Sequence, residues 1–177
     1  KPLISDAVLS VDTRNDLVGA KEFIDKAGAI IDQKGGVDVD PKQMSKYLFY
    51  KGKIYYRLSI SDDPAIKNLE PNALEIAADS YLKLVEFENR LGTKRYTDDA
   101  LLEIPYLAQS INARAYDKYE AKDFAGASAD FIKTYELKKN PALGAGARYD
   151  TTSYYYAGVM YNLAGDTTNA LKIFTDV

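Results

Sequence analysis

Histidine, cysteine and tryptophan are all absent from this chain of 177 residues. Without His or Cys, the sequence excludes a histidine general base, a thiolate nucleophile, a disulfide and a Cys/His zinc site. No apolar run approaches the roughly 20 residues that a membrane-spanning helix needs. The formal net charge of -3 provides no basic field for nucleic acid or for an anionic membrane surface. We therefore expect one ordinary globular domain that neither binds nucleic acid nor inserts into a membrane.

Sequence motifs of the common enzyme classes are also lacking. There is no GxSxG and no phosphate-binding GxxxxGK(S/T), and Gly144-Ala145-Gly146 lacks the third glycine of a dinucleotide-binding motif. The 26 acidic residues include no motif that marks a catalytic pair of carboxylates. The sequence thus predicts a protein that is not an enzyme and needs no cofactor.

Alternating acidic residues between Asp32 and Asp40 invite interpretation as a calcium site. The segment lacks both the Asp-x-Asp-x-Asp-Gly run and the closing Glu of an EF-hand loop. Asp40 directly precedes Pro41, as a helix N-cap precedes a proline in the first turn. We interpret the segment as a solvated turn that ends in a helix cap, and we predict no metal site. Asp62-Asp63 and Asp98-Asp99 are interpreted in the same way.

The chain does contain helical periodicity, which proline and glycine interrupt at intervals. The interruptions fall at Gly35-Gly36, Pro41, Asp63-Pro64, Pro71, Gly92, Pro141, Gly144 and Gly146. They predict about eight helices, over about 3–13, 16–33, 41–59, 72–90, 105–121, 124–138, 151–164 and 167–176. Asn72 is a further expected cap. Thr97 or Asp98 starts another helical segment, in which Pro105 either produces a kink or begins a new helix.

The last helical segment shows a regular spacing of large, small and aromatic residues. The pattern is that of a helix-turn-helix repeat of about 34 residues, and it is carried by Tyr154, Ala157, Gly158, Tyr161, Ala170 and Phe174. Gly165-Asp166 lies at the turn, where an open backbone conformation is needed. The small residues allow the two helices to approach closely, and Phe174 fills the adjoining gap.

The same pattern recurs three more times towards the N-terminus. It is carried by Ile111, Ala115, Phe124, Ala127 and Phe131 with a turn at Lys122-Asp123; by Leu48, Gly52, Tyr55, Ala77 and Tyr81; and by Ala7, Val8, Val11, Ala20, Ile24 and Ala27 with a turn at Asn15-Asp16. On these residues the chain resembles tetratricopeptide repeat (TPR) proteins over nearly its whole length. The resemblance implies an all-α fold, a right-handed α-α superhelix or TPR-like solenoid of about four helix pairs.

The helix pairs are expected at roughly 1-34, 41-90, 98-140 and 151-177, within a single TPR-like domain. Extra residues lie around 92–98 and 143–150, and an insertion runs from Ser59 to Pro71. Solenoid insertions emerge as loops, often on a binding face. The alternative is an inert surface excursion, and the sequence does not choose between the two.

Three strings resemble exported TPR proteins of the Bacteroidetes cell envelope whose function is unknown: YKGKIYY, KDFAGASADF and DTTSYYYAGVMYNLAGD. This resemblance implies a periplasmic or cell-envelope location. The chain starts at Lys1 without a Met, which is expected of a removed signal peptide or a shortened chain. It stops at Val177 inside a predicted helix, so we expect either that more protein follows or that this end packs on another copy.

In TPR proteins the first helix of each pair lines a concave groove that holds the ligand, so the resemblance implies a peptide-binding surface there. The candidates are Lys46, Phe49, Lys53, Tyr56 and Arg57 from the second pair; Gln109, Asn112, Tyr116, Tyr119 and Glu120 from the third; and Tyr155, Val159 and Asn162 from the fourth. Aromatic rings, amides and a basic cluster suit an extended peptide with some acidic character. The competing interpretation is that these tyrosines pack between successive helix pairs.

The leading functional prediction is a non-catalytic scaffold that binds a protein or peptide of unspecified identity. One alternative is a structural or assembly subunit that forms a homo-oligomer through its C-terminal end. Another is glycan capture, as in SusD-like envelope proteins, which also contain TPR helices. Those proteins are far longer and rich in Trp, a residue that this chain lacks.

Overall fold

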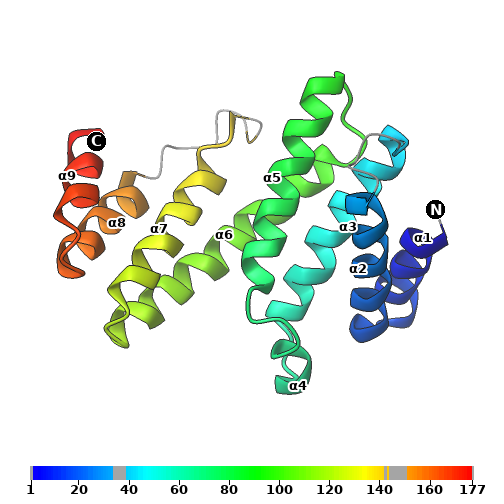
Figure 1. The fold of residues 1–177 in the computed structure, drawn as a ribbon, viewed down its shortest axis with the longest axis horizontal. Helices are drawn as coiled ribbons and strands as arrows, with labels where there is room; N and C mark the ends of the chain where they lie inside the picture. The colour runs from blue at the N-terminus through cyan, green and yellow to red at the C-terminus, as the bar shows by residue number, and fades with distance from the viewer. Residues whose placement is uncertain (1, 34–38, 142, 144–150, 177) are drawn as a thin grey trace. The chain divides into compact units, whose positions relative to one another are not determined.

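The computed structural model describes residues 2–33, 39–141, 143 and 151–176 of the chain (Figure 1). Every regular element in these ranges is a helix, which confirms the predicted all-α class. None of the described helices is both long enough and apolar enough to cross a membrane. The chain divides into two compact units, Lys1–Ala100 and Leu101–Val177, which are described separately below.

Unit 1 consists of successive helices that pack on their neighbours in chain order. They are α1 (Pro2–Leu9) with its π-helical continuation η1 (Ser10–Arg14), α2 (Leu17–Gln33), α3 (Pro41–Ser59), α4 (Pro64–Lys67), α5 (Ala73–Leu91) and the first turn of α6 (Thr97–Glu120). The long helices α1 and α2, α2 and α3, and α3 and α5 pack against each other (Figure 1). The unit is therefore built from antiparallel helix hairpins, as the repeat pattern predicted.

Unit 2 contains the rest of α6 with α7 (Phe124–Lys138), α8 (Thr151–Leu163) and α9 (Thr167–Asp176). Its core is formed by apolar residues of all four helices: Ala115, Ala127, Phe131, Ala157, Met160 and Ile173. Pro105 lies inside α6. The helix expected at 105–121 is thus the second part of a longer helix that begins at Thr97, and Pro105 does not begin a new one.

Side-chain caps and left-handed turn residues set most of the helix ends. Asp40 accepts hydrogen bonds from the amides of Lys42 (2.8 Å) and Gln43 (3.2 Å), which confirms it as the α3 cap. Asp63 caps α4 in the same way. Asn72 precedes α5, but its side chain makes no capping hydrogen bond, so that part of the prediction was wrong. At the turn between α8 and α9, Gly165 has a φ of 81°, which favours glycine.

Close approach of paired helices depends on small residues at the predicted positions. A Cβ added to Gly158 of α8 would lie 2.7 Å from Cε1 of Phe174 on α9. A Cβ added to Gly52 of α3 would lie 2.6 Å from Cε1 of Tyr81 on α5. The two hairpins therefore use the same device, in which an aromatic ring of the second helix lies directly on a glycine of the first.

The insertion from Ser59 to Pro71 contains the short helix α4 and returns to contact α2. Glu70 Oε2 lies 4.0 Å from Nζ of Lys21, which also forms an ion pair with Asp25 at 2.8 Å. Asp25 in turn accepts a hydrogen bond from the hydroxyl of Tyr55 on α3. The end of the insertion is thus tied to the α2–α3 hairpin. Whether the insertion is a binding loop or an inert excursion stays a prediction.

Some sequence predictions fall on residues outside the described ranges. These are most of the acidic turn between Asp32 and Asp40, most of the extra residues at 143–150, the Gly144-Ala145-Gly146 string and Val177. The structure supports no statement about them.

Candidate binding surface

The two aromatic candidates of α3 lie in the interior of unit 1. Phe49 and Tyr56 are only 7% and 9% exposed. The Phe49 ring stacks on Tyr96 with centroids 5.1 Å apart and contacts Tyr81 at 6.1 Å. These two side chains are therefore packing residues, as the competing interpretation of the aromatic candidates predicted.

The basic candidates of α3 contact the π-helical turn η1. Lys53 Nζ lies 2.8 Å from Asp12 Oδ1, and Arg57 donates a hydrogen bond to the Val11 carbonyl at 3.2 Å. Burial would raise the pKa of Asp12, but the bonds from Lys53 and Tyr50 outweigh it and hold that pKa below its ordinary value. Lys53 and Arg57 thus join η1 to α3. Lys46 lies half-buried on the same helix.

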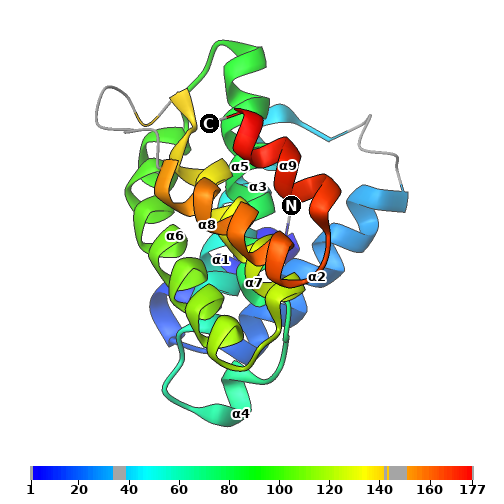
Figure 2. The same ribbon diagram turned by 90° about the vertical axis from the view of Figure 1, so that its left-hand side faces the viewer.

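In unit 2, α6 and α8 lie side by side and run in the same direction. Asn112 and Ser153 approach within 3.5 Å, and one turn further along both helices the rings of Tyr116 and Tyr156 meet at 6.2 Å. Because both contacts follow the same chain order, the two helices are parallel, with α7 returning between them in sequence (Figure 2). This is the relation between first helices of successive pairs in a repeat stack.

The adjacent faces of α6 and α8 carry four partly exposed tyrosines, which together we call the tyrosine face: Tyr116, Tyr119, Tyr155 and Tyr156. Their exposed fractions are 43%, 44%, 50% and 36%, respectively, so each ring presents a face or edge to solvent. Tyr116 and Tyr156 both rest on the buried ring of Phe131, at centroid distances of 5.2 and 5.6 Å. The core of unit 2 therefore holds these two rings in fixed positions.

The structure brings most of the unit 2 candidates to this surface. Asn112 lies beside Tyr116, while the exposed Gln109 lies two turns before Tyr116 on α6. Asn162 is exposed two turns after Tyr155 on α8, and Val159 packs against the core instead.

Sequence reasoning missed Tyr156, which is the α8 ring that contacts Tyr116. The run Tyr154-Tyr155-Tyr156 was the available signal, but spacing alone did not show which ring faces α6.

The charge around the tyrosine face is acidic. Helix α8 contains no charged residue, and Asp117 and Glu120 of α6 are exposed. The two basic residues of this part of α6 turn towards α7 instead: Arg114 and Lys118 both bind Asp130. The surface thus offers aromatic rings, amides and carboxylates rather than cations.

The chain matches no family model, no curated protein and no solved structure. No relative therefore supplies a function or a set of site residues.

Asp130 anchors α7 to α6, and its loss is expected to loosen this hairpin. Its side chain is 5% exposed; Arg114 Nε and Nη2 bind its two oxygens at 2.8 and 2.7 Å, and Lys118 lies at 2.9 Å. Asp130→Ala leaves two neighbouring cations without this carboxylate. Because both cations are partly solvated, we expect a loss of about 1–2 kcal/mol in urea unfolding. The exposed Asp117→Ala is the matched control and should change stability little; equal losses would contradict the anchor role.

Proposed function

We propose that this chain is a non-catalytic, TPR-like scaffold that binds a protein or peptide on the tyrosine face. The observation that carries the proposal is the set of four partly exposed tyrosines on two parallel helices. Tyrosines on rigid helices provide a large contact area with little loss of conformational freedom on binding. The antiparallel hairpins of both units support the superhelical part of the proposal, and an envelope location is proposed from the sequence strings alone.

The charge of the face favours a partner with apolar and basic side chains. Lys53 and Arg57, which suggested an acidic peptide, contact Asp12 and Val11 in unit 1. On α6, next to Tyr116 and Tyr119 in sequence, the acidic Asp117 and Glu120 are exposed. An arginine or lysine of a partner would pair with these carboxylates and lie over an exposed tyrosine ring.

Removing two rings of the tyrosine face is expected to weaken binding by at least about tenfold, because central aromatic residues dominate interfaces. The change is the double substitution Tyr116→Ala and Tyr155→Ala. A displayed peptide library is first selected on the unaltered protein, and the affinities of selected peptides are then measured by calorimetry. We expect the selected sequences to be rich in aromatic, apolar and basic residues.

The control for this experiment is Tyr106→Ala, an exposed tyrosine that lies roughly three turns before Tyr116 on α6. Tyr106 is 63% exposed, so its removal should leave both folding and peptide affinity unchanged. Circular dichroism checks that every variant is folded. Peptides that bind the double variant as tightly as the unaltered protein would show that the tyrosine face is not the binding site.

A second candidate function, self-association, is supported by the exposed apolar side chains of the last hairpin. Leu171 and Phe174 of α9 are 65% and 42% exposed, and Leu163 of α8 is 48% exposed. Such a surface is what an assembly contact requires. Light scattering over a range of concentrations distinguishes the candidates: a monomer at all concentrations argues against assembly, whereas a dimer that Leu171→Glu dissociates would support it.

A further inference from the structure

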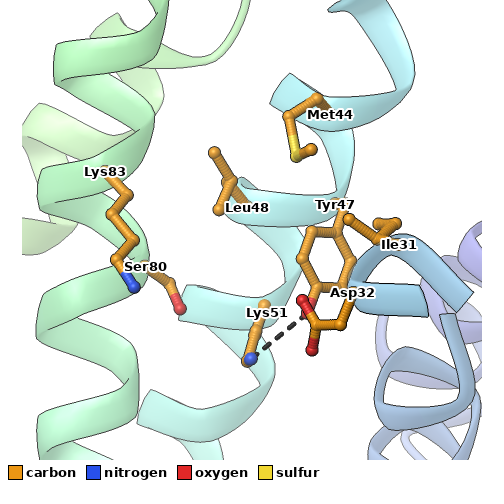
Figure 3. Close-up of a pocket in the computed structure, with 8 residues that line it drawn as sticks. All are labelled: Ile31, Asp32, Met44, Tyr47, Leu48, Lys51, Ser80 and Lys83. Atoms are coloured by element: carbon orange, nitrogen blue, oxygen red, sulfur yellow. Dashed lines mark hydrogen bonds between the residues drawn. The ribbon is translucent and has the colours of Figure 1, made fainter. Parts of the chain in front are cut away.

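A cavity in unit 1 is lined by residues other than those proposed above to bind a partner. Helices α2, α3 and α5 line this cavity of about 370 Å³, which opens to solvent (Figure 3). This volume lies in the lower part of the range typical of small-molecule sites, about 300–1,000 Å³. The cavity is therefore suited to a small molecule rather than to a folded partner.

One part of the cavity wall is apolar. Ile31 of α2 and Met44 and Leu48 of α3 line it, together with the ring of Tyr47 (Figure 3). Tyr47 and Leu48 are 7% and 8% exposed, so the surrounding helices hold this wall in place. An apolar body that entered the cavity would displace water from these side chains and gain free energy from their burial.

The other part of the wall carries two lysines. Lys51 donates a hydrogen bond to the Tyr47 hydroxyl at 3.1 Å, which leaves two of its three N–H groups for another acceptor. Lys83 of α5 lines the opposite side (Figure 3). Among residues 2–33, 39–141, 143 and 151–176, neither ammonium group forms an ion pair.

The remaining polar groups leave the net charge of the wall positive. Ser80 donates its hydroxyl to the Ile76 carbonyl at 2.6 Å, so its proton is already engaged. Among the described residues that line the cavity, Asp32 is the one acidic side chain, against two lysines. The lining residues thus carry a formal charge of one positive unit beside an apolar wall.

We propose that this cavity binds an apolar carboxylate, a small organic anion with one carboxylate and an apolar body. The carboxylate accepts hydrogen bonds from Lys51 and Lys83. The body lies against Ile31, Met44 and Leu48. The charge selects this class because a neutral apolar compound would leave the two ammonium groups without an anion. The shape selects it because a small polar anion would leave the apolar wall in contact with water.

Calorimetry with the whole chain tests the proposal, using octanoate and 4-phenylbutyrate as probes. Octanol has an apolar body without the charge, and acetate has the charge without the body. We expect at least one probe to bind, with octanol and acetate at least about tenfold weaker. Added salt should weaken binding of the anion, because it screens the attraction to the lysines. Failure of both probes to bind at about 10 mM would overturn the proposal.

Two single substitutions should change the affinity in opposite directions. Lys83→Gln removes an attracting charge and is expected to weaken binding by about threefold to tenfold, whereas Asp32→Asn removes a repelling charge and should strengthen it by about twofold. The exposed Lys67→Gln of α4 is the matched control and should have no effect. Equal affinities in all three variants, with folding verified by circular dichroism, would show that the lysines do not recognise the carboxylate.

Discussion

Replacing Glu88 with alanine is expected to lower the free energy of unfolding by about 3 kcal/mol, because buried donors lose a charged acceptor. Glu88 lies near the end of α5 and is 0% exposed. Its carboxylate accepts hydrogen bonds from Thr97 Oγ1 at 2.8 Å, the Thr97 amide at 3.0 Å and the Tyr96 amide at 3.2 Å. It therefore caps the start of α6 from the preceding helix. Urea unfolding followed by circular dichroism measures the loss.

The matched control for Glu88 is Glu86, an exposed acid on the same helix. Glu86→Ala should change the free energy of unfolding by less than about 0.5 kcal/mol. Glu88→Gln keeps the size of the side chain but presents an NH₂ donor to groups that also donate, so we expect an intermediate loss of about 1–2 kcal/mol. A Glu88→Ala variant as stable as Glu86→Ala would rule out the capping role.

The same carboxylate should make unit 1 sensitive to acid. Burial would raise the pKa of Glu88, but the hydrogen bonds from Thr97 and the Tyr96 amide outweigh it and hold that pKa below the ordinary 4.5. A lowered folded-state pKa means that this stabilisation is fully present above 4.5 and is lost as pH falls through the lowered value. Between about pH 6 and pH 3, Glu88→Gln should therefore lose less stability than the unaltered chain.

Local features of the fold could be predicted from the sequence because they depend on neighbouring residues. Asp40 before Pro41 predicted a cap that the structure contains, and Gly165 predicted a turn that needs a positive φ. Gly158 predicted a close helix approach, and Phe174 indeed lies over it. Each of these depends on a few residues that are close in sequence or related by the repeat spacing.

The π-helical turn η1 was not predicted. η1 continues α1 from Ser10 to Arg14 and ends at Asn15, whose φ is 52°. Its contacts with Lys53 and Arg57 join segments distant in sequence, so periodicity did not reveal them.

The sequence predicted which helices of unit 2 lie together at the candidate site better than it predicted which of their residues do. The alignment of the helices to the repeat spacing predicted that residues of α6 and α8, including Asn112 and Tyr116, lie in one region, and they do. It selected Tyr155 and not Tyr156, the ring that contacts Tyr116, because spacing alone did not fix the direction of two adjacent residues that differ by about 100° around the helix. It also could not show that Phe49 is covered by Tyr96, because that contact depends on how the chain returns after α5.

Gly52→Ala is expected to destabilise unit 1 by about 2 kcal/mol, although alanine is the better helix former. The added Cβ would lie within 2.6–2.9 Å of three atoms of the Tyr81 ring. Tyr81 is 0% exposed and lies against Phe49, so the ring cannot move aside without separating α5 from α3. The gain of about 1 kcal/mol in helix propensity therefore does not offset the strain. Thermal and urea unfolding measure the net effect.

Gly158→Ala provides the matched comparison, because the same substitution is made at the equivalent position of the α8–α9 hairpin. Its Cβ would lie 2.7 Å from Phe174 Cε1 and 2.9 Å from Ile173 Cγ2; Phe174 is 42% exposed, whereas Ile173 is only 4% exposed. The partly exposed Phe174 ring can turn towards solvent, but the buried Ile173 must shift within the core, so we expect a loss of about 1 kcal/mol, smaller than at Gly52. Equal losses at the two glycines would mean that burial of the opposing ring does not set the penalty. A stabilised Gly52→Ala variant would mean that α3 and α5 are not held at the close separation that Tyr81 requires.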